Sequence, residues 1–190
     1  MSAPATWRMD LPEGWVAWEP GTSDAASLAA DATTTARAAA ALRRRIRVVE
    51  KETTLLPGDV RHVGVRMTEP RSGQVSAGLY LTQWPRPVTD GKQLTARRHL
   101  DALRAAEPAP HRVHRHREVS VEQVPAGQLV LRNEVWRPQR KLGWVVELEA
   151  TIFPSRTDTM FELTVRSRHL DLQPQLMAEL SLMAHGFRLA

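Results

Sequence analysis

The stretch HRVHRHREVSVEQV, residues 111–124, carries the densest set of side chains in this protein that could do chemistry. Three histidines and three arginines occupy its first seven positions. Its later alternation of valine with polar residues predicts a β-strand, in which successive side chains point to opposite faces. His114, His116 and Glu118 would then share one face. Two imidazoles and a carboxylate are a ligand set that zinc accepts at sites with an open position.

The rest of the sequence gives this metal hypothesis little support. No His-x-x-x-His pair and no further cluster of histidines and acids accompanies it. We therefore expect no bound metal and no cofactor. The histidines and arginines are instead expected to pair with glutamates on neighbouring strands. A metal-binding protein or an enzyme that uses His114, His116 and Glu118 remains an alternative.

Sequence motifs of the common enzyme classes are absent. GQVSAG, residues 73–78, is one residue too long for the G-x-S-x-G turn that carries a nucleophilic serine. No G-x-G-x-x-G, G-x-x-x-x-G-K-[ST] or H-E-x-x-H sequence occurs. The chain has no cysteine, which excludes disulfides, thiol catalysis and thiolate metal sites. We expect a protein that is not an enzyme, although an active site assembled only by the fold would carry no such motif.

The net charge of +5 is a property shared with proteins that bind nucleic acid or acidic membranes. The basic residues are nearly all arginine, however, with lysine only at positions 51, 92 and 141. Together with abundant alanine and scarce asparagine, this is the bias of a GC-rich coding sequence. Nucleic acid is therefore not the expected partner.

The sequence predicts no membrane segment. No apolar run reaches the roughly 18–20 residues of a membrane-spanning helix. The opening MSAPATWRMDLPEGW lacks the basic-then-apolar pattern of a signal peptide. We expect a cytoplasmic protein.

A long helix is predicted from about residue 23 to residue 51, with Thr22 or Ser23 as its N-cap. Apolar and small side chains recur along it at steps of four and three, and they form one stripe. That stripe consists of Leu28, Ala32, Thr35, Ala39, Leu42, Ile46 and Val49. The opposite side carries a basic helix face made of Arg37, Arg44, Arg47 and Lys51. We interpret this face as solvated, with docking to nucleic acid as an alternative.

The remaining segments alternate between strands and helices. A hairpin is expected around EPRSG, residues 69–73, followed by a helix that runs from an Asp90 cap to about Glu107. A meander of four strands should follow, at residues 111–124, 127–136, 141–153 and 157–168. A terminal helix is expected from about Pro174 to Ala184.

Each of these elements has a single apolar side, which predicts helices packed on a sheet. The expected fold class is α+β, an α/β/α sandwich-like arrangement with an antiparallel sheet of about six strands. The long N-terminal helix and the C-terminal helix would flank the sheet, with the C-terminal helix on its apolar face. No internal repeat or linker divides the sequence, so residues 1–190 are expected to form one domain.

The other face of the meander is charged and is the expected binding surface. Trp136 lies on it beside Arg132 and Glu134, because residues two apart on a strand point the same way. A tryptophan among charges of both signs suits a protein partner better than a polyanion. The candidate binding residues are Trp136, Arg132, Glu134, Glu147, Glu149 and Arg166. Self-association of the chain is a further possibility.

Both ends of the sequence resemble one known family. MDLPEGWVAWEP near the start and TMFELTVRSRHLDLQPQLMAELSLMAHGFRL near the end are similar to the PsbP-like superfamily, which includes Ran-binding Mog-type proteins and actinobacterial LpqN-like lipoproteins. The resemblance covers about a third of the chain. It implies an α/β/α sandwich around an antiparallel sheet, and action by binding proteins or small ligands rather than by catalysis. Unlike the lipoproteins, this sequence shows no signal peptide and no lipid-bearing cysteine.

The resemblance and the charged face together favour a non-catalytic protein-binding module. Similar proteins encoded with secretion machinery make an accessory, adaptor or chaperone-like role the expected one, by analogy. The alternatives are the metal-binding protein or enzyme described above, and nucleic-acid binding through the basic helix face.

Overall fold

The computed structural model describes residues 7–22, 24–69, 71–107, 109–140, 143–155 and 157–189. The helices in these residues are α1 (Ala25–Asp31), α2 (Ala36–Thr53), α3 (Ala96–Ala105), the short 3₁₀ helix η1 (Leu170–Leu172) and α4 (Gln173–Gly186). The longer strands are β2 (Trp15–Trp18), β3 (Asp59–Met67), β4 (Val75–Pro85), β7 (Arg112–Val124), β8 (Gly127–Pro138), β9 (Val145–Pro154) and β10 (Thr159–Ser167). Two ribbons of paired two-residue strands complete the fold: β1 (Trp7–Arg8) with β11 (Arg188–Leu189), and β5 (Val88–Thr89) with β6 (Lys92–Gln93).

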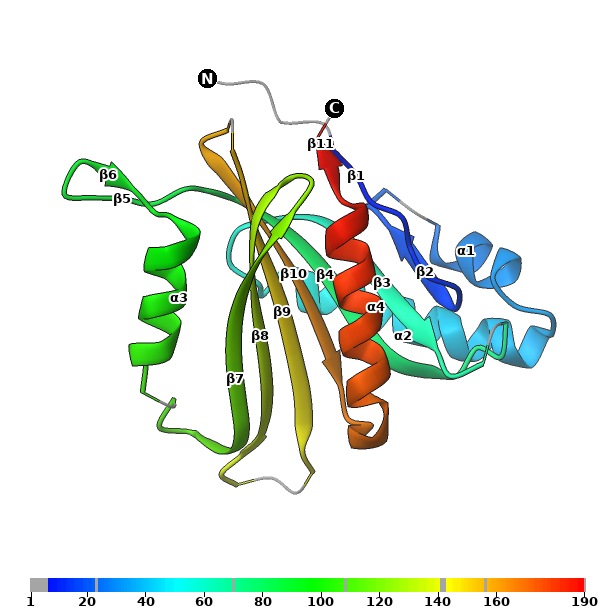
Figure 1. Cartoon of the computed structure of the whole chain (residues 1–190). Helices are drawn as coiled ribbons and strands as arrows, with labels where there is room; N and C mark the ends of the chain where they lie inside the picture. Colours follow the sequence, from blue (N-terminus) through cyan, green and yellow to red (C-terminus); the bar gives the residue numbers. More distant parts are fainter. Residues whose placement is uncertain are drawn as a thin grey trace.

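The seven longer strands form one antiparallel sheet in the order β2-β3-β4-β10-β9-β8-β7 (Figure 1). The predicted meander is confirmed as β7 to β10, and the predicted hairpin as β3 and β4. The sheet has one strand more than expected, because Trp15–Trp18 adds β2 at its edge. The α+β fold class is therefore confirmed.

Helix α4 covers one face of the sheet (Figure 1). Leu176, Leu180 and Met183 of this helix are fully buried against the apolar sides of β4, β8, β9 and β10. The ribbon of β1 and β11 extends this layer, and Trp7 stacks on Phe187 with ring centroids 5.9 Å apart. The two ends of the described chain therefore lie side by side.

The other face carries two separate helical layers. Leu42, Ile46 and Val49 of α2 pack on the β3–β4 side of the sheet. Helix α3 packs on the β7–β8 side, where Leu100 joins a second cluster with Val130. The middle of this face, along β8, β9 and β10, lies between the two clusters and carries polar side chains instead.

The predicted helix of residues 23–51 is wrong in its continuity, because the structure divides it into α1 and α2. Thr33 donates its hydroxyl hydrogen to the Ala29 carbonyl at 2.6 Å and closes the end of α1. Thr35 has an extended backbone, and its hydroxyl accepts the Ala38 N–H at 3.1 Å. A threonine in that geometry is an N-cap and begins a new helix. The predicted N-cap at Thr22 is wrong, because Asp24 caps α1 and its carboxylate accepts the Ala26 N–H at 2.9 Å. The alternative cap, Ser23, lies outside the described residues.

The expected Asp90 helix cap is also wrong. Asp90 and Gly91 both have positive φ, of 53° and 70°, and they form the tight turn between β5 and β6. Positive φ at both central residues of a two-residue turn is the geometry that an Asp-Gly pair favours. Helix α3 begins six residues later, where the Thr95 hydroxyl accepts the Arg98 N–H at 3.3 Å.

We predict that Leu148→Asp prevents folding or lowers the free energy of unfolding by at least about 3 kcal/mol, because it places an unpaired carboxylate in the apolar core. Leu148 is fully buried in the centre of β9. Leu182→Asp is the matched control, since Leu182 on α4 is 65% exposed. Thermal and urea unfolding followed by circular dichroism measure both variants. Equal stability of the two would contradict the assignment of the sheet's core face.

Candidate functional site

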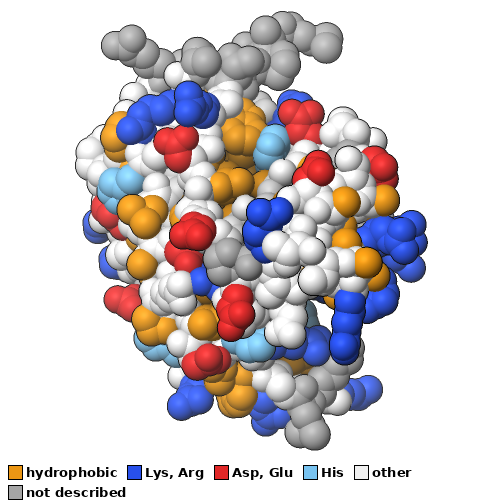
Figure 2. Space-filling view, turned by 90° about the vertical axis from the view of Figure 1, so that its right-hand side faces the viewer, with side chains coloured by type: hydrophobic (Ala, Val, Ile, Leu, Met, Phe, Trp, Pro, Cys, Tyr) orange, Lys and Arg blue, Asp and Glu red, His pale blue; other side chains and the backbone are white. Residues whose placement is uncertain are grey.

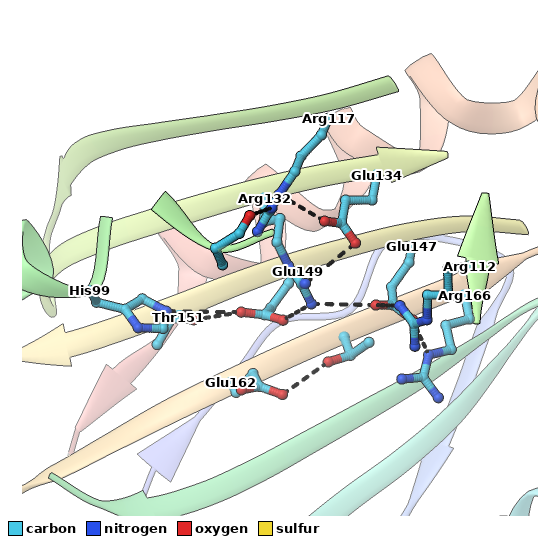
Figure 3. A network of polar contacts seen from close by, with 12 residues as sticks. His99, Arg112, Arg117, Arg132, Glu134, Glu147, Glu149, Thr151, Glu162 and Arg166 are labelled. Carbon is cyan, nitrogen blue, oxygen red and sulfur yellow. Dashed lines mark hydrogen bonds and ion pairs between the residues drawn. The ribbon is translucent and has the colours of Figure 1, made fainter. Parts of the chain in front are cut away.

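A network of buried charges occupies the polar strip between α2 and α3 (Figure 3). Glu134 of β8 and Glu147 of β9 lie directly opposite each other in the strand register. Like charges in that position repel unless a cation lies between them. Arg132 supplies the cation: its Nη1 is 3.3 Å from Glu134 Oε2 and its Nη2 is 3.3 Å from Glu147 Oε1. The same guanidinium also pairs with Glu149.

Glu147 accepts hydrogen bonds from three guanidinium groups. Arg166 Nε donates to it at 2.8 Å, and Arg112 Nη1 donates at 3.4 Å; Arg132 is the third donor. The side chain of Glu147 is only 2% exposed. Burial acts to raise the pKa of this carboxyl, but the guanidinium charges, foremost that of Arg166, outweigh burial and lower the pKa below its ordinary value. Glu147 is therefore a buried anion that fixes the arginines around it.

Glu134 is held in the same way from the edge strand. Arg117 Nε of β7 lies 2.9 Å from Glu134 Oε1, while Arg117 Nη1 donates to the Ala106 carbonyl at 2.8 Å. Ala106 directly follows α3, so this arginine ties the helix to the network. The expected pairing with glutamates on neighbouring strands is confirmed for Arg117 of β7. It is wrong for His116, which approaches Glu118 of its own strand.

The expected exposure of this charged face is wrong for its acids. Glu134, Glu147 and Glu149 are all buried. Arg166 is exposed, and Arg132 reaches solvent only in part. Because the acids lie beneath the arginines, the strip offers positive charge to solvent where the sequence predicted both signs.

Glu162 of β10 is the one acid of this network without a guanidinium partner among the described residues. Its carboxylate accepts a hydrogen bond from the Thr164 hydroxyl at 3.3 Å. Burial, together with the charge of Glu149, raises the pKa of Glu162 to about 7. His99 of α3 approaches Glu149 at 4.0 Å, and burial lowers the pKa of that imidazole.

A pocket of about 620 Å³ opens at the end of this strip, between α2 and the sheet. Trp136 forms part of its wall, and the Arg112 guanidinium lies over the indole ring at 3.8 Å from its centroid. The residues lining the pocket that carry charge or can become charged are Arg45, Glu52, Tyr80, Arg112, Arg166, Arg168 and His169. Of the predicted binding residues, the structure brings Trp136 and Arg166 into this pocket and leaves the others beneath or beside it.

The predicted shared face of His114, His116 and Glu118 is wrong. His114 pairs in register with Trp136, whereas His116 pairs with Val135. Trp136 and Val135 are consecutive on β8 and point to opposite faces. A β-bulge between the two histidines thus separates them, and His116 remains with Glu118 at 3.8 Å. Within the described ranges, no group of three histidines and acids is placed to hold a metal.

The four residues of the basic helix face, Arg37, Arg44, Arg47 and Lys51, are all exposed. Figure 2 views the molecule from its α1 and α2 side, where acidic and basic side chains are interspersed and Lys and Arg gather toward the right-hand edge.

Arg45, which lines the pocket, is absent from the predicted basic helix face. Helical spacing could have indicated its position. Arg45 is next to the buried Ile46 and seven residues before Glu52, which places Arg45 and Glu52 on the same side of the helix, beside its buried face.

We predict that Glu162→Gln stabilises the fold at pH 8 and has little effect at pH 5. A carboxyl whose pKa is higher in the fold than in the unfolded chain contributes stability below about 4.5, and loses it as the pH rises through about 7. The variant lacks that loss, so the gain at pH 8 should be on the order of 1–3 kcal/mol. Urea unfolding at the two pH values measures it, with the exposed Glu13→Gln as control. A gain equal at both pH values would contradict the raised pKa.

Solved structures with a similar fold exist, although the sequence itself matches no known family. No protein-family model matches the sequence, and no curated protein matches it. The solution structure of cyanobacterial PsbP from Synechocystis sp. PCC 6803 is similar over 97% of this chain and 86% of that chain, with 10% identity and a TM-score of 0.50. The crystal structure of LpqN, involved in cell envelope biogenesis of Mycobacterium tuberculosis, is similar over 99% and 86%, with 11% identity and a TM-score of 0.46. At these identities the likeness concerns the fold alone. The chain has a PsbP-like fold, as the two ends of its sequence indicated.

Proposed function

We propose that this protein is a non-catalytic binding module that acts on another protein as an accessory, adaptor or chaperone-like component. Its binding surface would be the wall of the pocket around Trp136 and the arginines of the strip. The observation that supports this proposal is the way the buried acids hold those arginines. Glu147 fixes Arg112 and Arg166, and the Arg112 guanidinium in turn lies over the Trp136 ring.

This arrangement suits binding for two physical reasons. Tryptophan and arginine are the side chains that most often dominate the energy of protein interfaces. A side chain that is already held in one conformation loses less entropy when a partner docks, so more of the contact energy remains as affinity. A fixed Trp136–Arg112 pair at the rim of a pocket combines both properties.

Nucleic-acid binding through the basic helix face is the second candidate. The observation that favours it is the exposure of Arg37, Arg44, Arg47 and Lys51 on one 18-residue helix. Contacts between several basic side chains and phosphates would give an affinity that falls steeply with salt. The bulge that separates His114 from His116 argues against the metal-site alternative.

No helix in the described residues is both long and apolar enough to cross a membrane. The search for the proposed partner starts with proteins that co-purify from native lysate. Mass spectrometry would identify the partner, and calorimetry with the purified pair would measure affinity at two salt concentrations.

We predict that Trp136→Ala weakens the partner's affinity by about 10- to 100-fold with a moderate salt dependence, because truncating a tryptophan that is a binding hot spot costs about 2 kcal/mol. The melting temperature should remain close to that of the wild type, since Trp136 is only half-buried. The double variant Arg37→Glu/Arg44→Glu is the control and should have a small effect. If the helix variant abolishes binding and Trp136→Ala does not, the functional surface is the basic helix face.

A further inference from the structure

The pocket between α2 and the sheet has a strongly unequal charge. Four arginines line it, from α2, β7, β10 and the residue after β10: Arg45, Arg112, Arg166 and Arg168. Glu52 is the one carboxylate among the lining residues that the structure describes. Its Oε2 accepts the Tyr80 hydroxyl hydrogen at 2.5 Å. Positive charge therefore exceeds negative charge in the space that a ligand would enter.

Much of the hydrogen-bonding capacity of these arginines is unused within the described chain. Arg166 donates its Nε to Glu147, which leaves both Nη groups without an acceptor among the described residues. Arg45 and Arg168 make no hydrogen bond or ion pair with any described residue. Glu147 holds Arg166 from below, so the unused Nη donors belong to a side chain that is already anchored.

The floor of the pocket is open because β4 has a glycine there. Gly78 lies opposite Arg166 in the strand register, so a side chain at this position would point to the same face. A Cβ at Gly78 would meet the Tyr80 ring and hydroxyl at 3.6–3.9 Å, which is ordinary van der Waals contact. A Cβ therefore fits at this position, and the further atoms of a larger side chain would extend into the pocket.

The geometry points to a small-molecule site in which Arg45, Arg166 and Arg168 bind the phosphate or carboxylate group of an anionic ligand. Guanidinium groups offer paired N–H donors that match the oxygens of both groups. A pocket of about 620 Å³ is of the size that holds small organic ligands. The rest of the ligand would pack on Trp136 and Val145, which line the same pocket. This site goes beyond the proposed function, because it requires no protein partner.

Calorimetric titration of the full chain with pyrophosphate and with citrate tests the site. We expect saturable binding of at least one probe, and the tighter of the two identifies the preferred group. Arg45→Gln should weaken that binding at least 5-fold, and Arg45→Gln/Arg168→Gln at least 30-fold. Neither residue belongs to the buried network, so both variants should fold.

Arg44→Gln is the matched control, because Arg44 is the adjacent arginine on α2 and is exposed. It removes the same charge and should change affinity less than 2-fold. Gly78→Leu should abolish binding by filling the floor, with all four arginines intact. Absence of saturable binding in the wild type, or equal weakening by Arg44→Gln and Arg45→Gln, would overturn the site. Either result leaves the test with Trp136→Ala and the protein partner unaffected.

Discussion

The buried carboxylate of Glu147 is the constraint around which this structure is arranged. A carboxylate removed from water is costly unless cations and hydrogen-bond donors replace its hydration. Three strands contribute an arginine to meet that requirement: β7, β8 and β10 supply Arg112, Arg132 and Arg166. Glu147 thus links strands across the middle of the sheet through side chains, in the region that neither α2 nor α3 covers with apolar residues.

The same constraint decides what the molecule presents to solvent. Because Glu134, Glu147 and Glu149 are buried, the arginines that pair with them converge on the sheet. Arg166 is the one of these arginines that is exposed. A surface that reads as mixed in sequence is in fact layered, with anions below and cations above. This layering is the basis of the anion site that we propose at the pocket.

Alternation along the strands is sufficient to predict the meander and its apolar face, and helical spacing is sufficient to predict α4, because each of these elements buries one complete side. The sequence does not predict three local features. Thr35 fits an apolar stripe as well as it fits an N-cap, and only the extended backbone distinguishes the two. Asp90–Gly91 is a favourable pair for a two-residue hairpin turn, but aspartate is equally common as a helix N-cap, so residue type does not distinguish the two. The bulge between His114 and His116 exchanges the faces to which the side chains before and after it point. The sequence of β7 alternates without interruption there, so the pattern contains no sign of the bulge.

The sequence does not predict the burial of the acids, for a different reason. A charged residue on a strand is ordinarily solvated, and its burial depends on which cations arrive from strands and helices distant in sequence. Arg117 reaches Glu134 from β7, and His99 approaches Glu149 from α3. The spacing of residues within one segment cannot predict such contacts between segments. The pocket has the same origin, since Arg45 comes from a helix that lies more than one hundred residues before Arg166.

Arg166 connects the interior network to the pocket, because one guanidinium serves both. Its Nε is committed to Glu147, and its Nη groups remain for a ligand. An anion bound there would draw on the positive charge that also stabilises the buried carboxylate. The two interactions do not compete for the same hydrogens, since a guanidinium has separate donors for each. Arg166 can therefore hold an interior anion and an exterior one at once, which a lysine with a single nitrogen could not do in the same geometry.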